Sequence, residues 1–146
     1  MQITTTNILF AQLTTEVLIV PLLQDVAPSR IQDLDTDLVD LIGRVNHHGD
    51  WKGEANELGL FYLHDLTNNP FPAIKRILLV GMGKQADWTY EQLRQALATA
   101  VNFVQKRQFD NATVILPPAS TPATLKDLAA VAVMATYQFT HYKTHD

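Results

Sequence analysis

The chain has 146 residues and a formal net charge of −4, with 47% hydrophobic and 18% charged residues. This length suits one domain with one hydrophobic core, and the composition is that of a globular protein without a membrane span. Zero cysteines exclude disulfides and thiolate chemistry, and the N-terminus lacks the basic residues and cleavage site of a secretory signal. We therefore expect a soluble, cytoplasmic protein.

The first part of the chain predicts two strands followed by a helix. Residues 3–10 and 16–23 are rich in β-branched and apolar side chains, which is typical of strands. From Ile31 to Val45, apolar residues recur at helical spacing and aspartates take the other positions, which indicates an amphipathic helix with an acidic start. The segment 46–59 contains three glycines and no apolar period, so we expect an exposed loop there.

Two strands and a second helix follow in the middle of the chain. Residues 58–66 and 75–82 are almost continuously apolar, and we expect both strands to be buried on both faces of a sheet. Thr89 and Gln92 have the spacing of a capping box ahead of an apolar stripe, so they predict a helix that ends near Gln108.

The last part predicts one more strand and one more helix. The strand covers residues 111–118 and ends at two prolines, and the helix has an apolar side from Leu125 that includes Thr136 and Phe139. The resulting order ββαββαβα favours an α/β fold, with a mixed and mostly buried sheet flanked by helices.

A glycine pattern follows the strand at 75–82. Gly81-x-Gly83-x-x-Ala86 matches a permitted form of the dinucleotide fingerprint, which makes Gly81, Gly83 and Lys84 candidate phosphate-binding residues. The helix signals, however, begin only near Thr89, and no acidic residue ends the next strand to bind a ribose. We therefore expect a turn that needs the backbone freedom of glycine, with nucleotide binding as the alternative.

Three short patterns place possible metal ligands close together: Asp33-x-Asp35-x-Asp37, His47-His48-x-Asp50, and His141 with His145. The first lacks the glycine and the glutamate of a calcium loop, so a solvated helix face is expected. The second lies in the predicted loop, where neighbouring histidines point apart, and the third lies at the end of the chain. We assign no metal site and no catalytic residue to these patterns.

Two serines and a tryptophan of the predicted loop are the remaining candidates for catalytic or binding residues. Ser29 and Ser120 are the only serines, and neither lies in the Gly-x-Ser-x-Gly context of a hydrolase nucleophile. Trp51 is expected to pack at the rim of the core, with a role as a binding platform as the alternative.

Three segments of the sequence, in the same order along the chain, resemble one protein family. Residues 50–63, 76–101 and 129–144 are similar to the N-terminal domain of the M17 leucyl aminopeptidases, also called cytosol aminopeptidases. The departures are local, since Ala130-Val131 stand where the family often has Glu-Gly and Trp51 stands where phenylalanine is common.

This resemblance implies a macrodomain-like α/β domain over residues 1–140, with 141–146 beginning a linker to a catalytic domain. In the family, that C-terminal domain is an exopeptidase that holds two divalent metals, zinc, manganese or magnesium. The metals are bound near an Asn-Thr-Asp-Ala-Glu-Gly-Arg run, which this sequence does not contain. The resemblance therefore assigns no catalytic residue and no cofactor to the residues of this chain.

The resemblance further implies a hexameric parent enzyme in which N-terminal domains make peripheral contacts. The chain is thus expected to be a non-catalytic structural and assembly domain, and a fragment or a separately expressed domain. Two alternatives remain, a free-standing binder of ADP-ribose or a related nucleotide and a DNA-binding accessory domain. The net charge of −4 without a basic stripe weighs against DNA.

Overall fold

The computed structural model describes residues 2–6, 14–27, 36–64, 66–116 and 133–138. Its strands and helices are, in chain order, β1 (Gln2–Thr6), β2 (Leu18–Leu22), α1 (Thr36–Val45), β3 (Leu58–Tyr62), β4 (Arg76–Gly81), α2 (Tyr90–Lys106), β5 (Asn111–Leu116) and β6 (Val133–Gln138). The strands form one sheet in the order β1-β6-β5-β2-β4-β3. The three central strands are parallel and the outer ones antiparallel, which confirms an α/β fold with a mixed sheet. A macrodomain-like arrangement stays a prediction.

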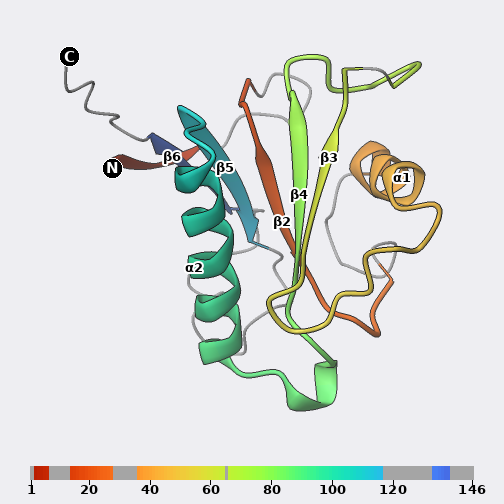
Figure 1. The fold of residues 1–146 in the computed structure, drawn as a ribbon, viewed down its shortest axis with the longest axis vertical. Helices are drawn as coiled ribbons and strands as arrows, with labels where there is room; N and C mark the ends of the chain where they lie inside the picture. Colours follow the sequence, from red (N-terminus) through yellow and green to blue (C-terminus); the bar gives the residue numbers. More distant parts are fainter. Residues whose placement is uncertain (1, 7–13, 28–35, 65, 117–132, 139–146) are drawn as a thin grey trace.

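Two hydrophobic layers cover opposite faces of the sheet, and each contains one helix (Figure 1). Successive residues of a strand point to opposite faces, so β2 contributes Leu18 and Val20 to the layer of α1, and Ile19 with the preceding Val17 to the layer of α2. All four side chains are fully buried. The core of the domain is therefore β2 and β4, which are apolar toward both helices.

Pro21 lies in the central strand β2, where a missing backbone N–H normally interrupts a ladder. The N–H of Met82 donates to the carbonyl of Leu22, so Leu22 faces β4 and Pro21 faces β5. β5 pairs with β2 only at Leu18 and Ile19. The missing N–H thus points toward a stretch where the described strands no longer pair, which explains why the strand tolerates a proline.

The burial predicted for the two middle strands is right for one of them. β4 is buried from Ile77 to its end, whereas β3 is only half-buried along most of its length. Among the described strands, β3 pairs with β4 alone and forms one edge of the sheet. The apolar side chains of β3 pack on both faces of the sheet, Phe61 in the layer of α1 and Leu58 and Leu60 in the layer of α2. They stay half-buried because no described strand lies on the outer side of β3.

The predicted final helix is wrong where the structure describes it. Residues Val133–Gln138 form β6, and Thr136, which was assigned to the apolar side of the helix, pairs with Thr4 of β1 and Thr113 of β5. Backbone partners on both sides and a content of β-branched and aromatic residues favour the strand. Residues 117–132 and Phe139 of the predicted helix lie outside the described residues.

A side chain caps the N-terminus of α2. α2 starts at Tyr90 as predicted, and the hydroxyl oxygen of Thr89 accepts a hydrogen bond from the N–H of Gln92 at 3.2 Å. The side-chain oxygen of Gln92 is buried without a hydrogen-bond partner, so only half of the predicted capping box forms. The predicted start of α1 at Ile31 lies outside the described residues.

We predict that Thr89→Ala lowers the free energy of unfolding by about 1 kcal/mol, because the N–H of Gln92 loses its side-chain acceptor at an exposed helix end and keeps only the Thr89 carbonyl. Urea denaturation followed by circular dichroism measures this change. Thr89→Ser keeps the oxygen and serves as the control. Equal midpoints for the alanine and serine variants would contradict the role of this cap.

Candidate functional site

The carboxyl ends of β2 and β4 are where an α/β sheet of this topology would bind a ligand. The chain leaves β2 toward α1 on one face and leaves β4 toward α2 on the other face (Figure 1). Ligands of open α/β sheets bind where neighbouring strands send their connections to opposite faces. The segments 22–27 and 81–87 therefore border the candidate site.

The space beside Gly81 is filled by the chain itself. A methyl group added to Gly81 would lie 2.0 Å from the carbonyl oxygen of Glu54 and 2.5 Å from the carbonyl carbon of Gly53. No side chain fits at this distance, so Gly81 is required for the close approach of another backbone segment. The predicted need for the backbone freedom of glycine is confirmed at Gly83, which has φ +76°. Gly81 belongs to β4 and is needed for another reason, the close approach of a peptide of the loop 46–57.

The backbone amides of the glycine pattern have partners within the chain. The N–H groups of Gly81 and Gly83 donate to the carbonyls of Glu57 and Gly53, at 2.8 and 3.1 Å. The N–H of Met82 donates to the carbonyl of Leu22 at 3.0 Å. These are the donors that a phosphate-binding loop presents to its ligand. A phosphate would have to replace hydrogen bonds that hold the strand ends together.

The segments after β2 and β4 are also bonded to each other. The N–H of Gln24 donates to the carbonyl of Gly83 at 2.8 Å, and the N–H of Gln85 donates to the carboxylate of Asp25 at 2.9 Å. An anionic acceptor thus already occupies one amide of the turn, and its negative charge opposes a second anion. Lys84 is exposed to solvent.

The helix that should follow a phosphate-binding turn begins late. A short 3-10 turn over Gln85–Asp87 separates the glycines from α2, which starts at Tyr90. This distance agrees with the capping signals in the sequence. The N-terminus of α2 therefore does not adjoin Gly81, as the fingerprint would require.

The segment 46–57 is a mostly exposed loop, as predicted, and its own side chains hold its shape. The amide of Asn46 donates to the carbonyl of Trp51 and accepts from its N–H, at 3.1 and 3.2 Å. The carboxylate of Glu57 accepts from the N–H groups of Lys52 and Glu54. Gly53 is buried, although its neighbours Lys52 and Glu54 are exposed.

Trp51 packs at the rim of the core, where the sequence placed it. The indole N–H donates to the carbonyl of Glu57 at 3.0 Å, and the ring is half-buried against the layer of α1. A methyl group on Gly59 would lie 2.9 Å from this ring, so Gly59 makes room for it on β3. Packing against Trp51 therefore explains why residue 59 is a glycine.

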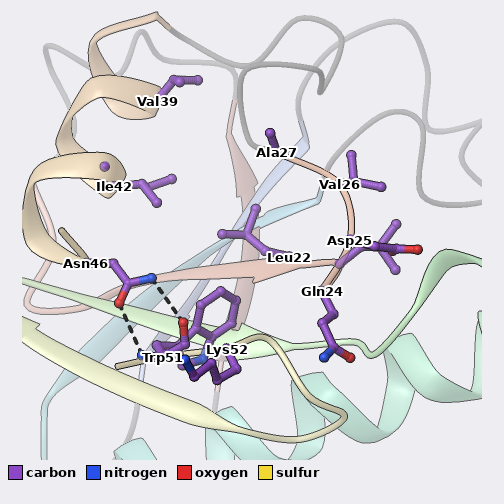
Figure 2. Close-up of a pocket in the computed structure, with 12 residues that line it drawn as sticks. Leu22, Gln24, Asp25, Val26, Ala27, Val39, Ile42, Asn46, Trp51 and Lys52 are labelled. Atoms are coloured by element: carbon purple, nitrogen blue, oxygen red, sulfur yellow. Dashed lines mark hydrogen bonds between the residues drawn. The ribbon is translucent and has the colours of Figure 1, made fainter. Parts of the chain in front are cut away.

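A pocket of about 560 Å³ lies between the end of β2, α1 and Trp51 (Figure 2). Its volume falls within the range of small-molecule sites. Leu22, Val39 and Ile42 give it apolar walls, while Figure 2 shows Asp25 and Gln24 turned away from Leu22 and Ile42. The polar groups of Asn46 and Asp25 already have partners within the chain. The walls formed by the end of β2 and α1 are thus apolar, and the polar side chains of Gln24 and Lys52 complete the lining.

Sequence reasoning missed this pocket and the two side chains that order the loop. Asn46 and Glu57 lie eleven positions apart, and each acts on the backbone of residues 51–54, which no periodic pattern reveals. The hollow forms only because α1 and the end of β2 meet Trp51 in space.

The three patterns considered as possible metal ligands form no metal site in the described part of the chain. His47 and His48 are exposed, with ring centroids 3.8 Å apart, and no group of three or more His, Asp or Glu side chains there could hold a metal ion. Asp37 lies in the first turn of α1. The remaining candidates lie outside the described residues: Asp33, Asp35, His141, His145, Ser29 and Ser120.

Among the described residues, no helix is long and apolar enough to cross a membrane.

The structure thus defines an α/β domain whose ligand crevice is filled by its own loop. A family model described as the cytosol aminopeptidase family, N-terminal domain, matches residues 19–146. The chain belongs to this family and corresponds to its N-terminal domain.

Individual relatives agree with this assignment. The probable cytosol aminopeptidase of Geobacter sp. (strain M21) is 32% identical over 133 residues, which cover 90% of this chain and 26% of that protein. The proteins of the same name from Roseiflexus castenholzii and Bacillus licheniformis are 30% and 32% identical and are covered over 22% and 23% of their lengths. The chain therefore spans about a quarter of the length of these relatives.

We predict opposite effects for two glycine-to-alanine substitutions. Gly81→Ala should lower the free energy of unfolding by at least about 2 kcal/mol, because the new methyl group overlaps the Glu54 carbonyl. Gly43→Ala, in the exposed side of α1 with no atom within 4 Å of the added group, should raise it by up to about 1 kcal/mol. Thermal and urea unfolding measure both. A Gly81→Ala variant as stable as Gly43→Ala would contradict the described loop contact.

Proposed function

We propose that this chain is the non-catalytic structural and assembly domain of a leucyl aminopeptidase. The observation that carries the proposal is the family match over residues 19–146 together with relatives about four times as long. In this proposal residues 1–140 form the domain, and 141–146 lead into a C-terminal catalytic domain. The parent enzyme releases N-terminal amino acids from peptides in the cytoplasm and assembles as a hexamer.

The metal chemistry of the proposed parent belongs to its catalytic domain. A two-metal hydrolase needs several carboxylate and nitrogen ligands that converge on ions about 3.5 to 4 Å apart. The described residues do not fit such a centre, because they bring no three potential ligands together. In this proposal the two divalent ions, zinc, manganese or magnesium, are held by the catalytic domain of the parent enzyme.

The filled crevice supports a structural role over nucleotide binding. Gly81, Met82 and Gly83 use their N–H groups to join β4 to β2 and to the loop 46–57. Such bonds make the carboxyl end of the sheet a rigid part of the domain. A domain that positions another one benefits from this rigidity, whereas a nucleotide site at Gly81, Gly83 and Lys84 would require the bonds to break. Nucleic acid is likewise an unfavourable partner for a chain of net charge −4.

We predict that the purified chain hydrolyses no leucine p-nitroanilide, with or without added zinc or manganese. The parallel sample is the Geobacter relative, assayed as its full-length chain and as its C-terminal portion alone. If the domain assists assembly, adding the isolated N-terminal domain to that portion should raise its hexamer fraction in sedimentation. Chelator-sensitive turnover by residues 1–146 alone would refute the non-catalytic assignment.

We also predict that the turn after β4 binds neither ADP-ribose nor NAD at micromolar concentration. Isothermal titration calorimetry tests this directly, since the backbone donors are already engaged. Lys84→Ala is the matched variant, because Lys84 is exposed and its loss leaves the turn intact. Micromolar binding that is lost in Lys84→Ala would favour the nucleotide-binding alternative.

A further inference from the structure

The outer edge of β3 carries backbone groups that point away from the sheet. The N–H of Gly81 donates to the carbonyl of Glu57, and the N–H of Leu63 donates to the carbonyl of Lys75. Odd-numbered residues of β3 therefore face β4, because hydrogen-bonding direction alternates along a strand. The even-numbered residues Leu58, Leu60 and Tyr62 face outward. Their N–H and C=O groups have no strand beside them in the described part of the chain.

This edge lacks the usual protection against pairing. Proteins commonly guard edge strands with charged residues or proline, and β3 has the sequence LGLFY with neither. Tyr62 is 50% exposed, and the remaining side chains of the strand are half-buried. Phe61 and the neighbouring Trp51 add half-buried aromatic surface on the α1 side. A strand added here would cover both the free backbone groups and this apolar surface.

We propose that β3 pairs with β3 of a second copy of the chain, in antiparallel orientation about a two-fold axis at Leu60. In this register Leu60 lies opposite Leu60 of the second copy, and Leu58 lies opposite Tyr62. Every outward-facing residue then meets an outward-facing residue, which gives three residue pairs that each exchange two hydrogen bonds. A shift by two residues loses at least one pair, so the central register is the most complete.

The charges at the two ends of β3 favour the antiparallel two-fold arrangement. Glu54 and Glu57 precede the strand, whereas Lys75 and Arg76, at the start of β4, lie beside its other end. The two-fold axis brings the acidic end of one copy to the basic end of the other. Asp65, the other charged residue of this turn, lies outside the described residues. A parallel pairing would instead place like charges together.

Arg76 keeps Tyr62 available for this contact. Its guanidinium lies 5.4 Å from the Tyr62 ring centroid and 4.4 Å from that of Phe109, so the tyrosine ring packs along the α2 face of its own sheet. The backbone of Tyr62 remains open at the edge. Pairing of two copies through β3 does not depend on the activity of any parent enzyme.

Amide exchange and sedimentation together test the proposal on the unmodified chain. Over roughly a hundredfold range of concentration, the sedimentation coefficient should rise from monomer to dimer. Over the same range, exchange of the Leu58, Leu60 and Tyr62 amides should slow, while that of Gly59 and Phe61, which already face β4, should not change. A monomer throughout, or a dimer in which those three amides stay unprotected, would overturn the proposal.

Two variants with matched controls address the contact directly. Tyr62→Pro removes the outward N–H together with the ring that packs against Arg76, and it should raise the dimer dissociation constant by at least about tenfold. Tyr62→Ala also loses the ring but keeps the N–H, so it should raise the constant by clearly less, and Tyr62→Phe should dimerise like the native chain. Lys75→Glu should raise the constant by about threefold to tenfold through repulsion from the acidic end, while Lys106→Glu, at the exposed end of α2, should not. Circular dichroism verifies that each variant folds. Unchanged dimerisation of folded Tyr62→Pro would refute pairing through β3.

Discussion

The approach of the Gly53–Glu54 backbone to Gly81 is the contact on which the carboxyl end of the sheet depends. At this point two backbone segments lie closer than any side chain would allow. The contact places the loop 46–57 so that Gly53 can accept from Gly83 and Glu57 can accept from Gly81. Asn46 and Glu57 hold the loop in the shape that the approach requires. One glycine thus joins the ends of β2, β4 and the loop into one rigid unit.

This rigid unit determines which backbone donors and surfaces of the domain are free to bind other molecules. In related α/β architectures the crevice between strand ends is left open for a ligand, and its amides are free donors. Here those amides stabilise the chain, and the hollow that remains beside α1 is apolar. The surfaces left for interaction are therefore its edges and faces, which agrees with a domain that assembles with other domains. Membership in the cytosol aminopeptidase family gives that role a context.

The accuracy of the sequence-based predictions varied with the range of the interactions that decide each element. α2 was predicted closely because its apolar stripe and the Thr89 cap are local features. β6 was missed because a segment with apolar residues at helical spacing became a strand between β1 and β5, both distant in sequence. The half-burial of β3 was missed for the same reason, since an edge position is a property of the sheet order.

The sequence by itself determined the alternating apolar strands, the amphipathic helix α2, the family resemblance and the need for a flexible glycine in the turn after β4, which is Gly83. These follow from side-chain periodicity and backbone conformation, which act over a few residues. Only the tertiary structure decided what approaches Gly81, that Pro21 lies where a missing donor does no harm, and which backbone groups of β3 remain free. Those outcomes depend on which segments meet in space, and hydrogen bonds between distant peptide groups leave no periodic trace in the chain.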